Sequence, residues 1–166
     1  IRRALEGTDL DWRLRSCELF TDESWKHAWR EFFEPLQLSE RVNVGPPWLA
    51  DEIGESGEAD IDLIIEPAMA FGTGNHATTQ LSAQLLDEAL AAAEDPPQVL
   101  DVGCGSAILS MLAAKLGAAR VVGVDISEDA IVSARENLQR NDVTEGVDLS
   151  TTPLAEVDGR FDIVVA

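Results

Sequence analysis

Three segments of the sequence combine residue types and spacings that could hold a small ligand. The first is Asp101-Val102-Gly103-Cys104-Gly105, which joins an apolar stretch over 99–102 to a helix expected over 107–116. Glycine lets the backbone turn sharply and approach a ligand closely, and the first turn of a helix presents unpaired N–H groups. Such a turn can hold the pyrophosphate of a dinucleotide or the adenosyl and amino-acid parts of S-adenosylmethionine. The alternative is a tight turn that binds nothing.

Spacing separates the two ligands. The dinucleotide fingerprint is G-x-G-x-x-G, and its third glycine would fall on Ile108, so that fingerprint fails. The methyltransferase pattern D/E-x-G-x-G-x-G is matched at Asp101, Gly103 and Gly105, with Ala107 in place of the last glycine. The turn therefore favours S-adenosylmethionine, with a slightly different backbone expected at Ala107.

Asp125 is the second candidate. It follows an apolar stretch over 121–124, 22 positions after Gly103. An acid about 20 residues beyond such a turn, at the end of the neighbouring strand, can accept both ribose hydroxyls of a nucleoside. Its alternative role is to cap the helix that begins near Ser127. Ser127 can fill that role itself, so the ribose role is favoured.

The third candidate is the loop Phe71-Gly72-Thr73-Gly74-Asn75-His76-Ala77-Thr78-Thr79. Its glycines and hydroxyls could wrap a small ligand, and Phe71 could cover a sulfonium because a cation is attracted to an aromatic face. An irregular linker with a threonine cap on the next helix is the alternative, and the residues alone leave both open. His76 could accept a proton, but holding the loop in shape is the favoured role.

Apolar strands alternate with helices along the part of the chain that carries these segments. Such alternation indicates a parallel α/β sheet, and continuously apolar strands indicate burial on both faces. In the helix over 78–93, the side chains expected to face inward are Leu81, Leu85, Leu86, Ala89 and Leu90. Strands are predicted over 12–15, 41–44, 61–65, 99–102, 121–124, 147–150 and 161–165, and helices over 24–33, 78–93, 107–116 and from Ser127 to about Asn141.

The fold class predicted from this order is α/β. We expect part of a small α+β domain over 1–50, an acidic loop and a linking strand over 51–66, and the N-terminal half of a Rossmann-like domain over 67–166. The 166 residues suffice for one ordinary domain, or for a small domain with part of another.

Composition excludes several classes of function. With 12 basic and 31 acidic residues the chain lacks the basic face of a nucleic-acid binder. The acidity indicates either solubility, as in a salt-loving source, or attraction of a basic protein substrate. Two unpatterned cysteines favour a reduced, cytoplasmic location, and two histidines with two scattered cysteines make no metal site. No stretch reaches the roughly 20 apolar residues of a membrane span.

The motifs together resemble one family. The order P-x-M-A-F-G-T-G-x-H-x-T-T, V-L-D-V-G-C-G-S and V-V-G-V-D-I is similar to the ribosomal protein L11 methyltransferase (PrmA) family. The segments 25–29, 33–35 and 47–48 resemble the part of that family that precedes the catalytic domain. The likeness covers most of residues 20–166, and the F-G-T-G loop is more distinctive than the glycine turn. Asn75, Ala77 and Ala107 depart from the family pattern.

This resemblance implies a substrate-recognition domain followed by a class I methyltransferase domain, which transfers methyl groups from S-adenosylmethionine to lysine and α-amino groups of a basic ribosomal protein. Thr79, Gly103 and Asp125 would contact the cofactor, and the segment 71–73 would line the cofactor or substrate side. No residue is singled out as a catalytic base. The full set expected at the cofactor is Phe71, Gly72, Thr73, Thr78, Thr79, Asp101, Gly103, Gly105, Asp125 and Ile126.

The family continues beyond the last predicted strand with an asparagine that helps to build the active site, whereas this sequence stops at Ala166. We therefore expect an excerpt of a longer enzyme that does not itself transfer methyl groups. Two alternatives stay open, namely a methyltransferase of the same fold with another acceptor and a catalytically silent binding module. A dinucleotide-dependent oxidoreductase is disfavoured by Ile108 and by the F-G-T-G loop.

Overall fold

The computed structural model describes residues 33–54, 59–66, 74 and 76–166. Residues 33–166 belong to one compact unit. The strand predicted over 12–15 and nearly all of the helix predicted over 24–33 lie outside the described residues, as does most of the loop over 67–75.

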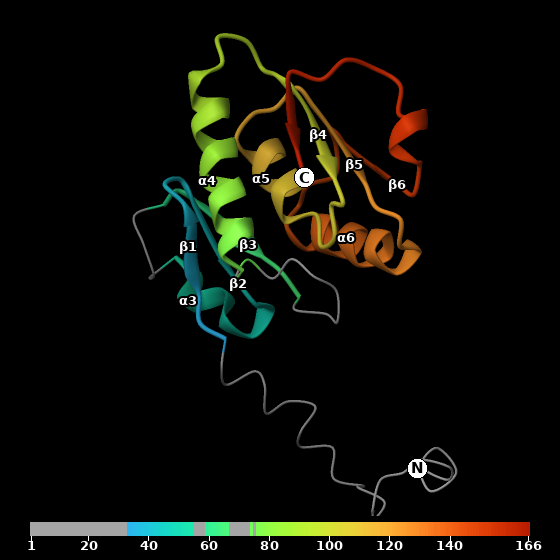
Figure 1. The fold of residues 1–166 in the computed structure, drawn as a ribbon. Helices are drawn as coiled ribbons and strands as arrows, with labels where there is room; N and C mark the ends of the chain where they lie inside the picture. Colours follow the sequence, from blue (N-terminus) through green and yellow to red (C-terminus); the bar gives the residue numbers. More distant parts are fainter. Residues whose placement is uncertain (1–32, 55–58, 67–73, 75) are drawn as a thin grey trace, which may run out of the picture. The chain divides into compact units, whose positions relative to one another are not determined.

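A parallel four-stranded sheet forms the larger part of this unit (Figure 1). Its strands stand in the order β6-β5-β4-β7, and all neighbouring pairs are parallel. The strands are β4 (Gln98–Val102), β5 (Arg120–Val124), β6 (Val147–Ser150) and β7 (Ile163–Val165). All four were predicted, although β7 begins two residues later than expected. The strand order reverses between β4 and β7, and the crevice at such a switch point is where open α/β sheets bind ligands.

Three longer helices accompany the sheet: α4 (Ala77–Ala92), α5 (Ile108–Lys115) and α6 (Glu128–Arg140). The start of α6 follows from its sequence, because Ser127 Oγ accepts the N–H of Ala130 at 3.2 Å as a helix cap does. Glu128 and Asp129 in the first turn suit the positive end of the helix dipole. The predicted cap at Ser127 is therefore confirmed.

A second, three-stranded sheet precedes α4. Its strands are β1 (Leu36–Ser39), β2 (Val42–Gly45) and β3 (Ile61–Ile64), with β2 antiparallel to β1 and parallel to β3. The predictions over 41–44 and 61–65 correspond to β2 and β3, whereas β1 was not predicted. Its four residues next to Pro35 are too few to show a period in the sequence.

The acidic segment that begins at residue 51 was expected to be a loop, and this is wrong for its first part. A short 3-10 helix (Pro47–Leu49) leads into the α-helix α3 (Ala50–Ile53). Ile53 is fully buried, and a Cβ placed on Gly45 would lie 2.7 Å from its Cγ1. Burial of this one side chain against β2 holds the turn in helical form.

The two faces of the larger sheet have different surroundings. Val99, Val121 and Leu149 belong to a large apolar core together with residues of all three helices and of the smaller sheet. On the other face, Leu100, Val122 and Val124 form a separate cluster with Val102, Val157 and Phe161. Side chains alternate between the faces along each strand, so the continuously apolar strands serve both clusters.

Helix α4 faces this core differently from the prediction. Leu86 and Leu90 are buried as expected, but Leu81 and Leu85 are 59% and 64% exposed. The buried face also includes Ala83 and Asp87. A helix with leucine on several sides has no unique apolar stripe, so its contacts with β1 and α5 decide which face is covered.

An ion pair joins the smaller sheet to α4. The Nε of Arg41 donates to Asp87 Oδ1 at 2.6 Å, and the backbone N–H of Arg41 donates to Asp87 Oδ2 at 3.2 Å. Burial alone would raise the pKa of Asp87, but the nearby hydroxyl of Ser39 and the hydrogen bonds and charge of Arg41 lower that pKa below its ordinary value. Asp87 is thus held ionised in a position that is 4% exposed.

Within the described residues, no helix is long and apolar enough to cross a membrane.

Candidate cofactor site

The glycine turn lies at the carboxyl end of β4, beside the switch point. Gly103 and Gly105 have φ angles of +75° and +53°, in the left-handed region that favours glycine. The N–H groups of Gly103 and Cys104 both donate to the carbonyl of Val124, at 2.7 and 3.0 Å. A Cβ added to Gly103 would meet nothing within 4 Å. The backbone at Gly103 therefore borders open space that a ligand could enter.

Ala107 stands where the methyltransferase pattern has its last glycine. It keeps the left-handed conformation, with φ of 64°, and is fully buried at the start of α5. Its N–H donates to the carbonyl of Cys104 at 2.8 Å. An alanine in this conformation costs about 1 kcal/mol, so the substitution retains the glycine-like backbone at a small energetic cost.

Asp125 lies at the end of β5 and binds this turn directly. Its Oδ2 accepts the N–H of Gly105 at 3.0 Å, and its Oδ1 accepts the N–H of Ser127 at 2.9 Å. A carboxylate has about four acceptor sites, so each oxygen keeps capacity for one hydroxyl. The next residue, Ile126, is fully exposed. The structure thus brings together Gly105, Asp125 and an exposed apolar side chain.

Asp101 is placed differently from the other acid. It is 2% exposed, and its Oδ2 accepts the hydroxyl of Ser110 at 2.6 Å. Burial raises the pKa of Asp101 to about 6, the negative charge of Asp125 adds to this, and the hydrogen bonds of Ser110 oppose it. The carboxyl therefore supports the turn from the protein interior and does not face the open space above Gly103.

Cys104, the middle residue of the turn, is 6% exposed. Burial, with the charges of Asp101 and Asp125, raises the pKa of its thiol to about 12. A protonated, buried thiol is a poor nucleophile, which favours a packing role for Cys104. Among the described residues, no group of three histidine, cysteine, aspartate or glutamate side chains could hold a metal ion.

The F-G-T-G loop is described only at Gly74 and from His76 onward, so Phe71, Gly72 and Thr73 lie outside the described residues. Gly74 is buried and has φ of +85°. A Cβ at this position would lie 3.1 Å from Val44 Cγ1 and 3.3 Å from Ile108 Cδ1. Gly74 is therefore held against the first residue of α5, directly after the glycine turn. Ile108, which breaks the dinucleotide fingerprint, packs against the other candidate loop.

The end of this loop caps α4. His76 is the capping residue: its Nδ1 accepts the N–H of Thr78 at 3.4 Å and lies 2.7 Å from Thr78 Oγ1. The cap is thus a histidine and not a threonine. Thr78 is exposed and Thr79 is half-buried in the first turn of the helix.

Sequence reasoning missed several polar residues around the site. Ser110 is the partner of Asp101. Two buried asparagines, Asn137 of α6 and Asn141 at its C-terminal cap, form side-chain hydrogen bonds to other segments. Asparagine is a poor residue for a helix interior. Asn137 inside the helix was therefore the signal available in the sequence, whereas Asn141 stands at the C-terminal cap of α6.

The fold and the site together define a class. A parallel sheet of this order, with a glycine turn after β4 and an acid after β5, is the cofactor-binding portion of a Rossmann-like class I methyltransferase. A crystal structure of ribosomal protein L11 methylase from Lactobacillus delbrueckii subsp. bulgaricus has a similar fold, with a TM-score of 0.66 and 37% sequence identity. The match covers 79% of this chain and 64% of that chain.

The chain belongs to the family "Ribosomal protein L11 methyltransferase (PrmA)", whose sequence pattern matches residues 4–166. It is 43% identical over 154 residues to the ribosomal protein L11 methyltransferase of Geotalea uraniireducens, across 87% of this chain and 48% of the relative. It is 46% identical over 145 residues to that of Geobacter metallireducens, across 87% and 46%. The chain spans about half the length of the curated relatives that it matches.

Proposed function

We propose that this chain is the cofactor-binding part of an S-adenosylmethionine-dependent N-methyltransferase that modifies lysine and α-amino groups of ribosomal protein L11 in the cytoplasm. The observation that carries the proposal is the direct contact between the glycine turn and Asp125, in a chain of this family. A substrate-recognition part over 1–50, a link over 51–66 and a cofactor domain over 67–166 belong to the same proposal.

The residues present fit S-adenosylmethionine. The open space at Gly103 lets the amino-acid part of the cofactor approach the backbone. The remaining acceptor sites of Asp125 suit the two ribose hydroxyls, and the exposed Ile126 offers an apolar surface for the adenine ring. Thr78 and Thr79 of α4, with the segment 71–73, complete the expected cofactor contacts.

The bound cofactor supplies a methyl group that its sulfonium has already activated. The protein must therefore mainly hold an uncharged amine behind that methyl, in line with the bond between the methyl carbon and the sulfur. In the part of the chain that the structure describes, Asp125 and the glycine turn would fix the cofactor end of this alignment. The amine can lose its proton to water, so no side chain is assigned as a base.

The substrate assignment is supported by the names of the relatives, which are ribosomal protein L11 methyltransferases. The net charge of −19 supports it as well, because an acidic surface attracts a basic protein and speeds its encounter with the enzyme.

The proposal is tested with the full-length protein that contains this chain, incubated with methyl-labelled S-adenosylmethionine and large ribosomal subunits. We expect label on L11. Label on a different lysine-rich protein would show that L11 is not the substrate, while the proposed reaction would still hold. If no protein is labelled although the full-length protein still binds S-adenosylhomocysteine, the protein is a binding module and the proposed enzymatic activity is refuted.

The role of Asp125 is tested separately by calorimetry with S-adenosylhomocysteine. Asp125→Ala removes the acceptors of the ribose hydroxyls and of the Gly105 N–H, so we expect at least tenfold weaker binding, on the order of 1.5–3 kcal/mol for hydrogen bonds to a charged group. The control is Asp129→Ala, an exposed acid in the first turn of α6. Equal affinities of the two variants would remove Asp125 from the site.

A further inference from the structure

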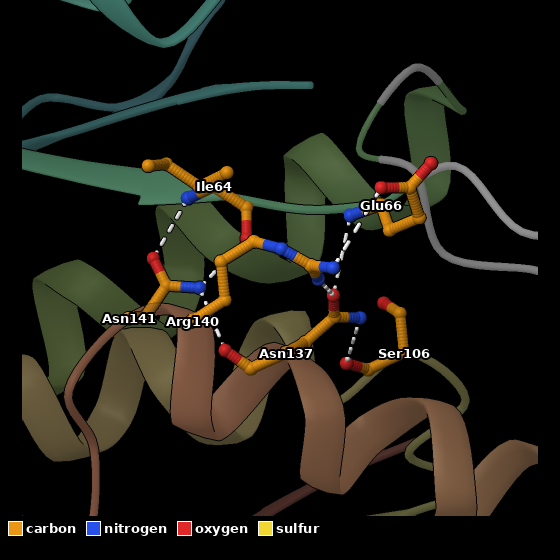
Figure 2. A network of polar contacts seen from close by, with 6 residues as sticks. All are labelled: Ile64, Glu66, Ser106, Asn137, Arg140 and Asn141. Carbon is orange, nitrogen blue, oxygen red and sulfur yellow. Dashed lines mark hydrogen bonds and ion pairs between the residues drawn. The ribbon is translucent and has the colours of Figure 1, made fainter. Parts of the chain in front are cut away.

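Asn137 of α6 and Asn141 at its C-terminal cap form hydrogen bonds with the open edge of β3 and with Glu66 just after it. The other edge of β3 pairs with β2, where the N–H groups of Ile61 and Ile65 donate to the carbonyls of Arg41 and Gly45. Because backbone groups alternate along a strand, those of Ile64 and Glu66 point away from β2. They meet the side-chain amides of Asn141 and Asn137, as Figure 2 shows.

Asn141 pairs with Ile64 as a neighbouring strand would. Its Oδ1 accepts the N–H of Ile64 at 2.7 Å, and its Nδ2 donates to the carbonyl of Ile64 at 2.7 Å. One turn earlier in the helix, Asn137 Oδ1 accepts the N–H of Glu66 at 3.2 Å. Four helical residues rise about 6 Å and two strand residues about 6.6 Å, so the spacing of the asparagines matches that of Ile64 and Glu66.

Asn137 also reaches the glycine turn. Its Nδ2 donates to the carbonyl of Ser106 at 3.2 Å, and Ser106 stands between Gly105 and Ala107. Figure 2 shows the amide of Asn137 between Glu66 and Ser106. The side chain of Asn137 is fully buried, so this single amide connects the end of β3 to the turn without water.

Arg140 fixes the orientation of that amide. Its Nη1 donates to Asn137 Oδ1 at 2.9 Å, and its Nη2 lies 3.7 Å from Glu66 Oε2. With two donors at Oδ1 and the carbonyl acceptor of Ser106 at Nδ2, the alternative orientation of the amide would leave every partner mismatched.

Contacts of this kind lie on both sides of the segment 67–73. Glu66 is the last described residue before the segment 67–73, and Gly74 follows that segment. Glu66 is tied to Ser106 through Asn137, and Gly74 is held against Ile108. The described residues on either side of the segment 67–73 therefore contact Ser106, through Asn137, and Ile108, which flank Ala107 at the start of α5.

We propose that Asn137 and Asn141 are positioning residues of the cofactor site, which hold the end of β3 and Glu66 against Ser106, the residue that follows the glycine turn. They act through the backbones of Glu66, Ile64 and Ser106, and not by touching the cofactor. This inference rests on the proposed binding of S-adenosylmethionine.

The test compares variants of the full-length protein in their affinity for S-adenosylhomocysteine, their unfolding midpoints and their kinetics. Asn137→Asp keeps the acceptor for Glu66 but loses the hydrogen bond to the carbonyl of Ser106, and it places a carboxylate in a fully buried position. We expect about tenfold weaker binding, with a raised KM for S-adenosylmethionine and an unchanged KM for the ribosomal substrate. Asn141→Asp, which loses the donor to Ile64, should act in the same direction.

The control is Ile131→Val, a buried apolar substitution on the same helix that leaves the hydrogen bonds of both asparagines in place. It should lower the unfolding midpoint without weakening binding. If Asn137→Asp does not fold, Arg140→Gln removes one donor at the helix surface and should weaken binding about threefold.

The outcomes are distinguishable. A parent protein that binds no S-adenosylhomocysteine overturns the proposed function, and this inference with it. A parent that binds, with asparagine and arginine variants that bind equally well or lose affinity only as Ile131→Val does, overturns the positioning role alone. A parallel rise in both KM values would also overturn it, because it would indicate general loss of structure.

Discussion

Replacement of Asp101 by asparagine should remove a pH-dependent cost from the folded protein. The pKa of Asp101 rises from 3.8 to about 6 on folding, mainly through burial. The folded state therefore binds this proton more tightly than the unfolded state. The stabilisation that the folded state gains from this proton is fully present below about pH 4 and is lost as the pH rises through about 6.

The magnitude follows from the two pKa values. Each pH unit between them corresponds to about 1.4 kcal/mol, so the full effect is about 3 kcal/mol, and about half of it falls between about pH 5 and 8. No discount for solvent is needed, because Asp101 is 2% exposed. Asparagine does not ionise and still offers an oxygen to Ser110, so the stability of the variant relative to the parent should rise by about 1–2 kcal/mol over this range.

The assay is urea unfolding of both proteins at several pH values, kept above the sequence pI of about 4.2 to avoid precipitation. The quantity compared is the difference in the free energy of unfolding between variant and parent, and only its change with pH is used. Any effect of the substitution that does not depend on pH therefore cancels. Ser110→Ala provides a second check, because loss of the hydroxyl hydrogen bond that lowers the pKa of Asp101 should make the pH dependence steeper. A stability difference that stays constant between about pH 5 and 8 would refute the reasoning.

Two further predictions concern stability. Arg41→Ala should destabilise the protein by about 2 kcal/mol, because it leaves the buried Asp87 without its cation. Arg120→Ala breaks an exposed ion pair with Asp148 and should cost less than about 1 kcal/mol. Equal losses of stability in urea unfolding would contradict this prediction. Gly74→Ala should cost more than Gly117→Ala, because both have positive φ but only Gly74 faces side chains within 3.4 Å; similar unfolding midpoints would show that the loop does not pack as described.

The sequence determined the local elements and the family of this protein. The apolar runs of β4 and β5, the cap at Ser127 and the glycine turn each depend on a few adjacent residues, so their patterns are readable without a structure. The family assignment likewise depends on the order of short motifs, and the match over residues 4–166 confirms it.

Only the tertiary structure decided which side chains are buried and which distant segments meet. The leucines of α4 gave no unique face, and contacts with β1 and α5 left Leu81 and Leu85 exposed. Asp101 and Asp125 are both acids at strand ends, yet one lies in the interior and the other faces the turn. Asn137 pairs with Glu66, 71 positions away. Burial and such pairings depend on how separate elements pack together, a long-range property that no local pattern records.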